Sequence, residues 1–556
     1  METREMSQDS AMGVSMRVAR GLVSAAAVAL LAGAAAGDDR TITGWGNNLL
    51  DDTRGMAGTN LIRMAMGARY DDGVGQMMDG PNPRAVSNAI AVQGGKTGNH
   101  RALSSMHWQW GQFIDHDFTL IEEGGEFAPI AVPMGDPQFD PFGTGTQMIP
   151  FHRSKYGAGV DSARTHANEL STWIDGSNVY GSDEVRAAAL RTGVGGRLAT
   201  SAGDMMPYNT GGLPNAGGTG PTLFLAGDVR ANEQAGLTTM HTVFVREHNY
   251  WADRIAGDNP GWSDEQVYQR ARKIVGAEIQ AITYNEYLPA LLGGAAPRAS
   301  DAAYDASVDP AISETFSAAA FRLGHTMLNS ELKRYNEDGT EYAGGHLSLS
   351  QAFFHPSIVT EPGSLDAIVR GLAQQQAEAI DTRVVDDVRN MLFGPPGAGG
   401  LDLLSLNIQR GRDHGLQDYN TIRAQFGLTP VGSFAEITSD AGLATMLEAL
   451  YGDVDTIDPW VGLMSEDAMP GSSLGETAAA ILIDQFTRLR DGDRFFYLWD
   501  DDLSEVLSEI ESTRLSDILL RNTDIVSLQG NVFLVPAPGA GVLLAMGGLL
   551  ATRRRR

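Results

Sequence analysis

The stretch "WGQFIDHDFTL", Trp110–Leu120, places two carboxylates and an imidazole side by side in an aromatic and apolar segment. Charged side chains are rarely buried unless they are paired or bind a ligand. In a helix, Gln112, Asp115 and His116 share one face, because residues three and four apart are neighbours. Asp117 is turned about 100° away from His116. The pattern therefore predicts a helix that serves two different sites, one on each face.

The composition excludes several kinds of site. The 556 residues contain no cysteine, so disulfides, thiolate nucleophiles, zinc–thiolate sites and iron–sulfur clusters are excluded. Any metal must rest on histidine and oxygen ligands. The formal net charge of -28 argues against nucleic acid and anionic membranes as main partners. The chain is long enough for a large buried core, and its 42% hydrophobic content is ordinary for a globular protein.

The N-terminus has the pattern of an export signal. Arg17 and Arg20 precede the apolar run "GLVSAAAVALLAGAAAG", which ends in small residues. A basic flank, a short apolar run and a small-residue site predict a secretory signal peptide over residues 1–36. An amphipathic or core helix is the alternative, and either Met1 or Met16 fits as the start of translation.

The C-terminus "VPAPGAGVLLAMGGLLATRRRR" resembles the PEP-CTERM sorting tail of exported bacterial proteins. Its apolar run of about fourteen residues is shorter than the about 20 needed to span a bilayer. The four final arginines are expected to stay on the cytoplasmic side. The resemblance implies that residues 534–556 anchor the chain transiently, until a sorting protease releases it to the cell envelope or outside.

The chain between these ends reads as mainly α. Apolar residues recur with helical spacing over 237–257 and 264–292, whereas strand-like alternation is scarce. Gly and Pro cluster in three predicted loops, at 121–150, 208–221 and 394–400. No composition shift marks a linker, so we expect one large domain over residues 40–533, with many helices, long loops and little β structure.

A second motif, "STWIDGS", offers oxygen donors at alternate positions. Ser171, Asp175 and Ser177 contribute side chains, and Trp173 contributes its backbone carbonyl. All-oxygen ligation suits a hard cation such as calcium. Asp117, on the other face of the predicted helix, is a candidate partner. Taken alone, the loop fits a turn or a helix cap equally well.

Three further segments carry chemistry. Arg230 and Glu233 lie three apart in "FLAGDVRANEQAGL", and Arg322 and His325 lie three apart in "AAAFRLGHTML". The small residues before Arg322 would let a flat ligand approach the backbone closely. A lone histidine such as His325 is more often a core residue than a ligand, so the argument rests on the set. The third segment, "SLNIQRGRDHGLQDYN", is dense in polar groups: Asn407, Arg410, Arg412, Asp413 and His414.

The ordered set of motifs resembles the animal-type haem peroxidase superfamily, the group of myeloperoxidase, lactoperoxidase and peroxidasin, in a bacterial secreted version. The resemblance covers roughly residues 40 to 533. It is carried by "GWGNNLLD", "GPNPRAVSN", "WGQFIDHD", "DGSNVYGS", "FLAGDVRANE", "MHTVFVREHN", "FRLGHT", "LNIQRGRDHGL", "IDPWVGLMSE" and "RLRDGDRFFY".

The resemblance implies roles for the residues on both sides of a haem. His116 matches the distal histidine, a general base and then a general acid toward peroxide. Arg230 matches the distal arginine, and Gln112 matches the residue that hydrogen-bonds water, peroxide or halide. His325 matches the proximal iron ligand. Asn407 matches the partner that accepts the other ring N–H of that histidine.

The resemblance also implies how haem b and calcium are held. Asp115 and Glu233 match the carboxylates that form ester bonds to haem methyl groups, which removes their charge. Arg322 and Arg410 match positions near the haem propionates. The implied calcium ligands are Asp117, Ser171, Trp173, Asp175 and Ser177.

The activity implied is that of a haem-dependent peroxidase. It reduces hydrogen peroxide and oxidises halide, thiocyanate or phenolic donors through an oxoferryl intermediate, as in a response to oxidative stress. Gln234 stands where the chloride-oxidising type has a methionine bonded to a haem vinyl group. Gln234 cannot make that bond, so we expect bromide or iodide rather than chloride as substrates.

Two alternatives stay open. The first is a fatty-acid dioxygenase on the same fold, whose chemistry uses a tyrosine three residues before the proximal histidine. Arg322 occupies that position here. The second is a non-catalytic surface or adhesion protein with an idle pocket.

Overall fold

The structure is a computed structural model that describes residues 39–63, 67–159, 162–301, 303–392 and 400–536. The predicted signal peptide and the part of the predicted tail beyond Pro536 lie outside the described residues. Within them, no helix is both long enough and apolar enough to cross a membrane.

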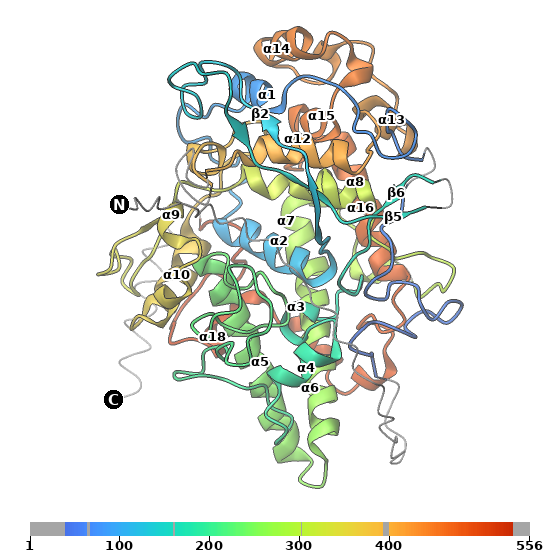
Figure 1. The fold of residues 1–556 in the computed structure, drawn as a ribbon. Coiled ribbons are helices and arrows are strands. Elements are labelled where there is room, and N and C mark those ends of the chain that lie inside the picture. The colour runs from blue at the N-terminus through green and yellow to red at the C-terminus, as the bar shows by residue number, and fades with distance from the viewer. Residues whose placement is uncertain (1–38, 64–66, 160–161, 302, 393–399, 537–556) are drawn as a thin grey trace, which may run out of the picture. The chain divides into compact units, whose positions relative to one another are not determined.

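The prediction of a mainly α fold is confirmed, since helices carry most of the described structure (Figure 1). The α-helices in the first half are α1 (Pro83–Ile90), α2 (Ser105–Phe118), α3 (Ser177–Tyr180), α4 (Glu184–Leu190), α5 (Ala235–Asp258), α6 (Asp264–Ile282) and α7 (Leu288–Leu292). Those in the second half are α8 (Glu314–Ala318), α9 (Leu349–Ala352), α10 (Ser364–Gln374), α11 (Asp386–Arg389), α12 (Leu403–Asp413), α13 (Tyr419–Gln425), α14 (Ala441–Tyr451), α15 (Pro459–Ser465), α16 (Glu476–Asp491), α17 (Leu507–Ser512) and α18 (Leu515–Arg521).

Tighter and wider helical turns join these elements. The π-helical turn is η1 (Thr283–Tyr287), and the 3₁₀ turns are η2 (Gly293–Ala295), η3 (Ala299–Asp301), η4 (Ala320–Thr326), η5 (Pro356–Thr360), η6 (Phe434–Glu436), η7 (Val454–Thr456) and η8 (Asp501–Leu503).

The strands are short and form antiparallel pairs. β1 (Glu123–Phe127) pairs with β4 (His152–Ser154), and β2 (Ile130–Ala131) pairs with β3 (Met148–Ile149). The other pairs are β5 (Gly157–Ala158) with β6 (Arg164–Thr165), and β7 (Glu331–Leu332) with β8 (Leu347–Ser348). Residues 121–150, expected as a loop, thus contain short strands. Local alternation is too brief there to be read from sequence.

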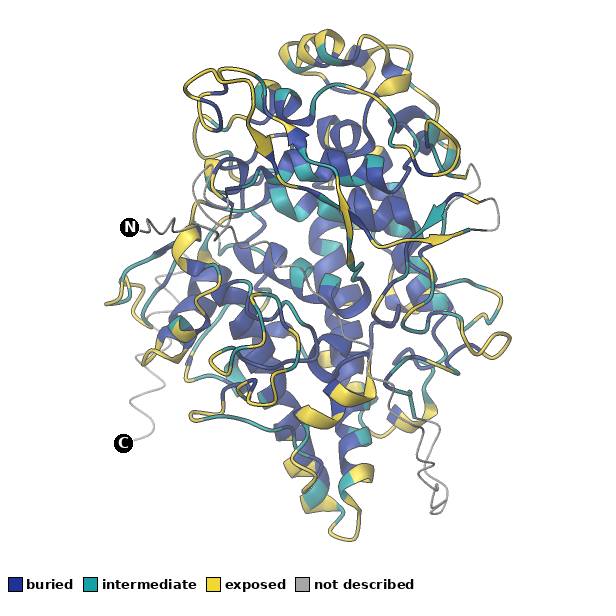
Figure 2. Ribbon diagram, in the orientation of Figure 1, coloured by how far each residue is buried: buried dark blue, intermediate teal, exposed yellow. Residues whose placement is uncertain are grey.

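Helix α2 is buried on nearly all sides. It packs against α3, α5, α10 and η4. Trp110, Phe113, Ile114 and Phe118 have no exposed surface. Figure 2 shows that α5 and α6, which pack against each other, are buried over much of their length and exposed where they meet at their common end. A helix buried all round must satisfy its polar side chains internally, because no face is left for water.

The long pattern predicted over 264–292 begins with a capping box. The Ser263 side chain accepts from the Gln266 backbone N–H, and the Gln266 side chain accepts from the backbone of Ser263. These bonds satisfy donors that every helix start leaves open. The pattern does not stay regular, because η1 interrupts it before α7.

The segment with the candidate iron ligand differs from an α-helix. Residues Ala320–Thr326 form the 3₁₀ helix η4, directly after α8. Three residues per turn align side chains at i and i+3. Arg322 and His325 therefore project from the same side of η4. Their side chains are more nearly aligned along the helix axis than they would be in an α-helix.

A buried ion network ties α1 to two distant segments. Arg84, with no exposed side-chain surface, lies 2.8 Å from Asp136 and 2.8 Å from Asp402. It also donates to the Asn390 side chain at 2.8 Å. In a chain without disulfides, this network links residues about 50 and 300 positions apart.

Replacing Arg84 with methionine is expected to lower the free energy of unfolding by about 3–5 kcal/mol, because two carboxylates stay buried without their cation. Urea unfolding measures the change. Arg383→Met is the control: its ion pair with Asp381 is 45% and 28% exposed, so a loss below about 1 kcal/mol is expected. Equal losses in both variants would contradict the assignment.

Candidate functional site

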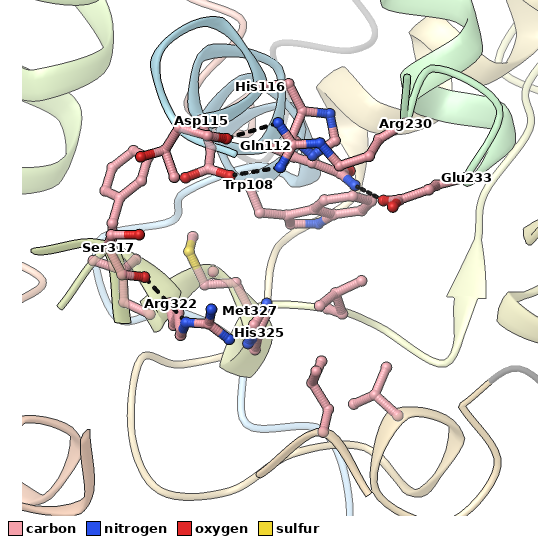
Figure 3. A pocket seen from close by; sticks show the side chains of 18 of the residues that line it. Trp108, Gln112, Asp115, His116, Arg230, Glu233, Ser317, Arg322, His325 and Met327 are labelled. Carbon is pink, nitrogen blue, oxygen red and sulfur yellow. Dashed lines mark hydrogen bonds and ion pairs between the residues drawn. The ribbon is translucent and has the colours of Figure 1, made fainter. Parts of the chain in front are cut away.

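The predicted site residues from distant segments meet in one cavity of about 360 Å³. A volume in this range suits a cofactor-sized ligand. Figure 3 shows side chains of α2 above the cavity and those of η4 below it. The predicted residues that line it are Gln112, Asp115, His116, Arg230, Glu233, Arg322, His325 and Arg410.

The predicted division of α2 into two faces is confirmed. Gln112, Asp115 and His116 line the cavity, whereas Asp117 is fully buried and contacts the loop at 176–178. Burial, and then the positive charge of Arg230, hold the pKa of His116 well below its ordinary value. The imidazole is therefore neutral at neutral pH and able to accept a proton.

Asp228 is a site residue that sequence reasoning missed. Its carboxylate accepts from Nε and Nη2 of Arg230, each at 2.9 Å, and from the Arg230 backbone N–H at 2.8 Å. Oδ1 of Asp228, which accepts from Nε of Arg230, also lies 3.5 Å from Nδ1 of His116. Although burial opposes it, Arg230 holds the pKa of Asp228 below its usual range. Asp228 thus faces both predicted distal residues as a carboxylate.

The sequence carried one signal for Asp228: its place two residues before Arg230 in "GDVR". That spacing lets the carboxylate cap a turn and hold the arginine at once. A turn-capping aspartate is common, so the pattern alone did not separate a site residue from a turn residue.

The opposite wall is built by η4 and α12. Nδ1 of His325 lies 3.1 Å from Oδ1 of Asn407, and Nη1 of Arg322 donates to the same oxygen at 3.3 Å. A guanidinium can only donate, so the amide oxygen must face both groups. The Asn407 amide nitrogen also lies 3.0 Å from this Nδ1, so both amide atoms contact it. The tautomer with its hydrogen on Nδ1, which donates to the oxygen, leaves a lone pair on Nε2. Burial lowers the pKa of His325 to about 3, which keeps that ring neutral.

This arrangement is what a histidine metal ligand requires. A ligating imidazole is neutral, and its other nitrogen donates to an oxygen acceptor that fixes the ring. His325 meets both conditions and lines the cavity.

Positive charge gathers at the edge of the same wall. Burial lowers the pKa of Arg322 to about 10, with Arg410 acting in the same direction. In the described part of the chain, Arg322 has no carboxylate within ion-pair distance; it donates to Ser317 and Asn407. Arg410 pairs with Asp413 at 2.7 Å. An anionic group bound beside Arg322 would therefore relieve an uncompensated charge.

Two carboxyl groups line the α2 side of the cavity. Burial raises the pKa of Asp115 to about 6 and that of Glu233 to about 7, with Arg230 acting in the opposite direction on both. Nη1 of Arg230 lies 3.6 Å from Asp115. Gln112 donates to Glu233 at 3.3 Å. Both carboxyls are costly to ionise here, so neutralisation by any means would stabilise the site.

Behind the cavity, Asp117 meets the "STWIDGS" loop. Ser177 Oγ donates to the backbone carbonyl of Asp117, and Ser171 Oγ donates to Asp175 at 3.1 Å. Burial, and then the charge of Asp175, raise the pKa of Asp117 to about 8. The oxygen donors of four predicted ligands thus converge, and two of them are carboxylates that a hard cation would neutralise. Trp173 lies buried in the same loop; ligation by its carbonyl remains a prediction.

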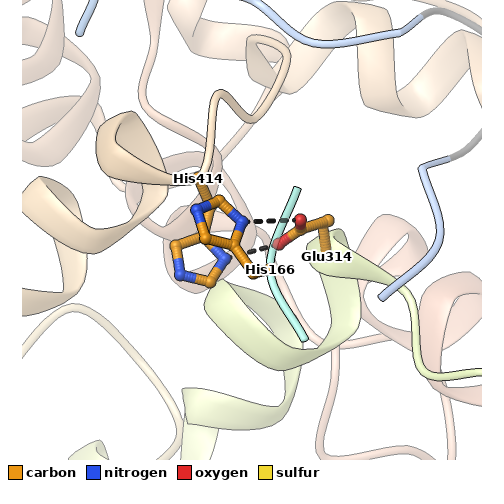
Figure 4. A group of neighbouring side chains, drawn as sticks. All are labelled: His166, Glu314 and His414. Carbon is orange, nitrogen blue, oxygen red and sulfur yellow. Dashed lines mark hydrogen bonds and ion pairs between the residues drawn. The ribbon is translucent and has the colours of Figure 1, made fainter. Parts of the chain in front are cut away.

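A second histidine cluster lies at the cavity edge (Figure 4). Nδ1 of His166 lies 2.8 Å from Glu314, Nδ1 of His414 bonds the other Glu314 oxygen, and the two rings stack at 3.8 Å. Ligands of a tetrahedral metal, bonded at about 2.0–2.2 Å, lie roughly 3.3 Å apart. The separations here are those of shared protons, so the cluster is a hydrogen-bonded triad.

The triad connects to the cavity through a polar chain. Nε2 of His414 lies 2.9 Å from Ser154 Oγ, which accepts from Arg410 at 2.7 Å. Ser154 and His414 both line the cavity. The sequence places His414 close to Arg410. It does not indicate that His166 joins them, because His166 lies about 250 positions earlier in the chain than His414.

Comparison with known proteins gives a consistent result. Residues 39–533 match the family described as "Animal haem peroxidase". The chain is 36% identical over 514 residues to "Peroxinectin A" of Dictyostelium discoideum, covering 89% of this chain and 95% of the relative. It is 35% identical over 540 residues to "Probable oxidoreductase PXDNL" of Homo sapiens, covering 88% of this chain but only 37% of that relative's length.

Solved structures show the same architecture. "Peroxidase A from Dictyostelium discoideum" superposes with a TM-score of 0.84 at 35% identity, over 90% of this chain and 100% of that chain. A fatty acid alpha-dioxygenase from Oryza sativa superposes with a TM-score of 0.76 at 23% identity, over 90% of this chain and 87% of that chain. The second likeness shows a shared fold alone.

If calcium fills the Asp117 loop, a chelator should lower the melting temperature by roughly 5–10 °C. A ligand held at about 1,000 times its Kd stabilises by about 4 kcal/mol, and large domains shift by about 2 °C per kcal/mol. Differential scanning calorimetry with and without chelator measures this.

Calcium should restore the melting temperature, and Asp175→Asn should not respond to chelation. A chelator-insensitive wild type without stoichiometric calcium by atomic absorption would overturn the prediction.

Proposed function

Since the chain belongs to the animal haem peroxidase family, we propose that this haem-dependent peroxidase reduces hydrogen peroxide and oxidises small anionic or phenolic donors. The observation that carries the proposal is the pair of histidines on opposite walls of one cavity, with Nδ1 of His116 3.5 Å from Asp228 and Nδ1 of His325 3.1 Å from Asn407. One faces a carboxylate and the other faces an amide oxygen. Such a pair offers a proton acceptor on one side and a metal ligand on the other.

The cavity fits a haem by its donor set. His325 has a free lone pair at Nε2 and a fixed ring, so we assign it as the iron ligand. Arg322 and Arg410 supply the positive charge that propionates need, and Arg322 lacks a carboxylate partner in the described chain. Asn407 holds His325 in the required tautomer. When bound, the haem supplies the iron at which peroxide is cleaved.

The distal residues move the proton. We assign His116 as the base that takes a proton from hydrogen peroxide and returns it to the leaving oxygen. Its Nδ1 faces Asp228, so the other ring nitrogen serves the cavity. Arg230, held by Asp228, stabilises the negative charge that develops on the leaving oxygen. Gln112 contributes a hydrogen bond to a ligand in the same space.

We further propose that Asp115 and Glu233 would hold the haem through ester bonds to its methyl groups. Each ester replaces one methyl C–H bond, with hydrogen peroxide as the two-electron oxidant, which is reduced to water. Burial raises the pKa of both carboxyls, and an ester removes the charge that burial opposes. The link would also retain the cofactor in a chain without cysteine. Calcium in the Asp117 loop would hold α2, and with it His116, against movement.

The donor range follows from Gln234. Its side chain lines the cavity as an amide, so a sulfonium bond to the haem cannot form. We propose bromide, iodide, thiocyanate or phenols as donors in preference to chloride. Export by the N-terminal signal, and release from a transient membrane anchor by cleavage of the C-terminal tail, remain part of the proposal.

The dioxygenase alternative has one specific point against it. Arg322 stands three residues before His325 and donates to Asn407, so the position that a catalytic tyrosine would need is occupied. Oxygen uptake with a fatty acid in place of peroxide would favour the alternative. Bound haem without oxidation of any donor would favour a surface or adhesion protein.

The first test is the visible spectrum of the purified protein before and after one equivalent of hydrogen peroxide. We expect a Soret band that shifts on addition. His116→Ala should bind haem but slow that shift roughly 10²–10⁴-fold, the usual share of a general acid–base group. Stopped-flow absorbance measures the rate.

His355→Ala is the matched control, because His355 is exposed and lies outside the cavity. It should react at the wild-type rate. A preparation that takes up no haem, even when haem is supplied during expression, would remove the enzyme assignment. An unchanged rate in His116→Ala would remove the role of His116.

Turnover with bromide at acid pH should exceed turnover with chloride, because Gln234 cannot form the sulfonium link of chloride-oxidising relatives. Halogenation of monochlorodimedone at equal halide concentrations measures both. Efficient production of hypochlorous acid would refute the proposed donor range.

A further inference from the structure

Three glutamine side chains form a continuous hydrogen-bonded chain that ends at the cavity. Gln234 Nε2 donates to Oε1 of Gln109 and, at 3.0 Å, to Oε1 of Gln112. Gln234 Oε1 accepts the backbone N–H of Gly236 at 2.6 Å. Gln112 Nε2 then donates to Glu233 Oε2 at 3.3 Å, as Figure 3 shows.

The donor-to-acceptor direction of this hydrogen-bonded chain is fixed where Gln234 meets Gly236. An amide side chain can turn over, because its oxygen and nitrogen are nearly the same size. The Gly236 backbone N–H, in the first turn of α5, can only donate. Gln234 must therefore present its oxygen to Gly236, and its two N–H groups must point to Gln109 and Gln112.

Gly236 also makes room for the arrangement. A Cβ at this position would lie 2.5 Å from Gln109 Oε1 and 2.9 Å from Gln234 Oε1. Any larger residue would push the two amides apart. The position therefore permits both the N–H donor and the close approach of two side chains.

The fixed orientation of Gln234 determines which atoms Gln112 presents to the cavity. Its oxygen is held by Gln234, so it presents only N–H groups to the cavity. One N–H bonds Glu233, whose oxygen accepts in the carboxyl and the ester form alike. In the described part of the chain, the second N–H has no acceptor. Together with Arg230, it lines this corner with N–H donors beside the carboxyl groups of Asp115 and Glu233.

Structural packing alone does not account for the chain. Gln109 is fully buried and its Nε2 has no partner among the described residues. A buried polar network with an unpaired donor is a poorer core than an apolar one. The hydrogen-bonded chain of glutamines is therefore better explained by its effect on Gln112, where the chain meets the cavity.

We propose that Gln234 is a positioning residue: it locks the Gln112 amide with its N–H groups toward the cavity, where bromide or thiocyanate would accept from them. The inference rests on the proposed function, because it names the residue that selects the charge of the donor. Gln234 acts through Gln112.

Gln234→Glu tests the direction of the chain. One oxygen of the new carboxyl group still accepts from Gly236, and the other meets the Gln112 oxygen, so the Gln112 amide turns over. The Kd of thiocyanate for the resting holoprotein, measured by Soret difference titration, should rise roughly 10- to 100-fold, the loss of one hydrogen bond to a charged group. The KM for bromide should rise likewise, with little change in kcat.

Neutral donors separate anion binding from general damage. The KM for guaiacol, a neutral donor, should stay within about threefold of wild type. Because the thiocyanate titration needs no turnover, an inactive but haem-loaded protein would still test this inference, while its inactivity would count against the proposed function.

Gln109→Glu is the charge control. It adds a carboxyl group nearby but still accepts from Gln234, so the Gln112 amide keeps its direction. The thiocyanate Kd should rise far less than in Gln234→Glu. Equal increases in both variants would show an effect of charge alone and overturn the inference, as would an unchanged Kd in Gln234→Glu.

Gln234→Leu covers the case in which Gln234→Glu fails to load haem. It removes the donor to Gln112 without adding charge, so the amide turns freely. An intermediate rise in the thiocyanate Kd supports the inference, and an unchanged Kd overturns it.

Discussion

The burial of Asp115, His116 and Asp117 in consecutive positions of one helix is the constraint on which the rest of the structure depends. Helix α2 has no solvent face, so each polar group needs its own internal partner. Asp117 finds one in the loop at 171–178, and His116 lies 3.5 Å from the carboxylate of Asp228. Asp115 faces the cavity beside Arg230. The polar side chains of this one helix therefore need partners from three distant segments, which pack around it.

Several hydrogen bonds in this polar interior have a fixed direction, because one partner in each can only donate or only accept. Arg322 can only donate, so Asn407 turns its oxygen toward His325. The carboxylate of Asp228 can only accept, so it orders Arg230. Gly236 can only donate, so it sets Gln234 and, through it, Gln112. Arg230, Gln112 and His325 are each oriented in this way, directly or through one neighbour, by a group that can only donate or only accept.

The same principle holds away from the cavity. Arg84 joins Asp136 and Asp402 in the core, and in another buried space the two oxygens of Glu314 bond one His166 and one His414 nitrogen. A chain with no cysteine thus gains its long-range links from buried ion pairs and hydrogen bonds. Such links are strong only when every member is satisfied.

The sequence by itself determined the mainly α class, the helical α2 with its two polar faces, and the order of the motifs, because helical periodicity and i, i+3, i+4 spacing are local properties. It also predicted eight of the residues that line the cavity, through motifs in family order. It did not reveal Asp228, which faces His116 from 112 positions away in the chain, or the glutamine chain, whose members come from two separate segments. It also missed the 3₁₀ form of η4, which depends on packing. Only tertiary structure decided which donor meets which acceptor, because hydrogen-bond direction depends on neighbours that folding brings together from distant segments.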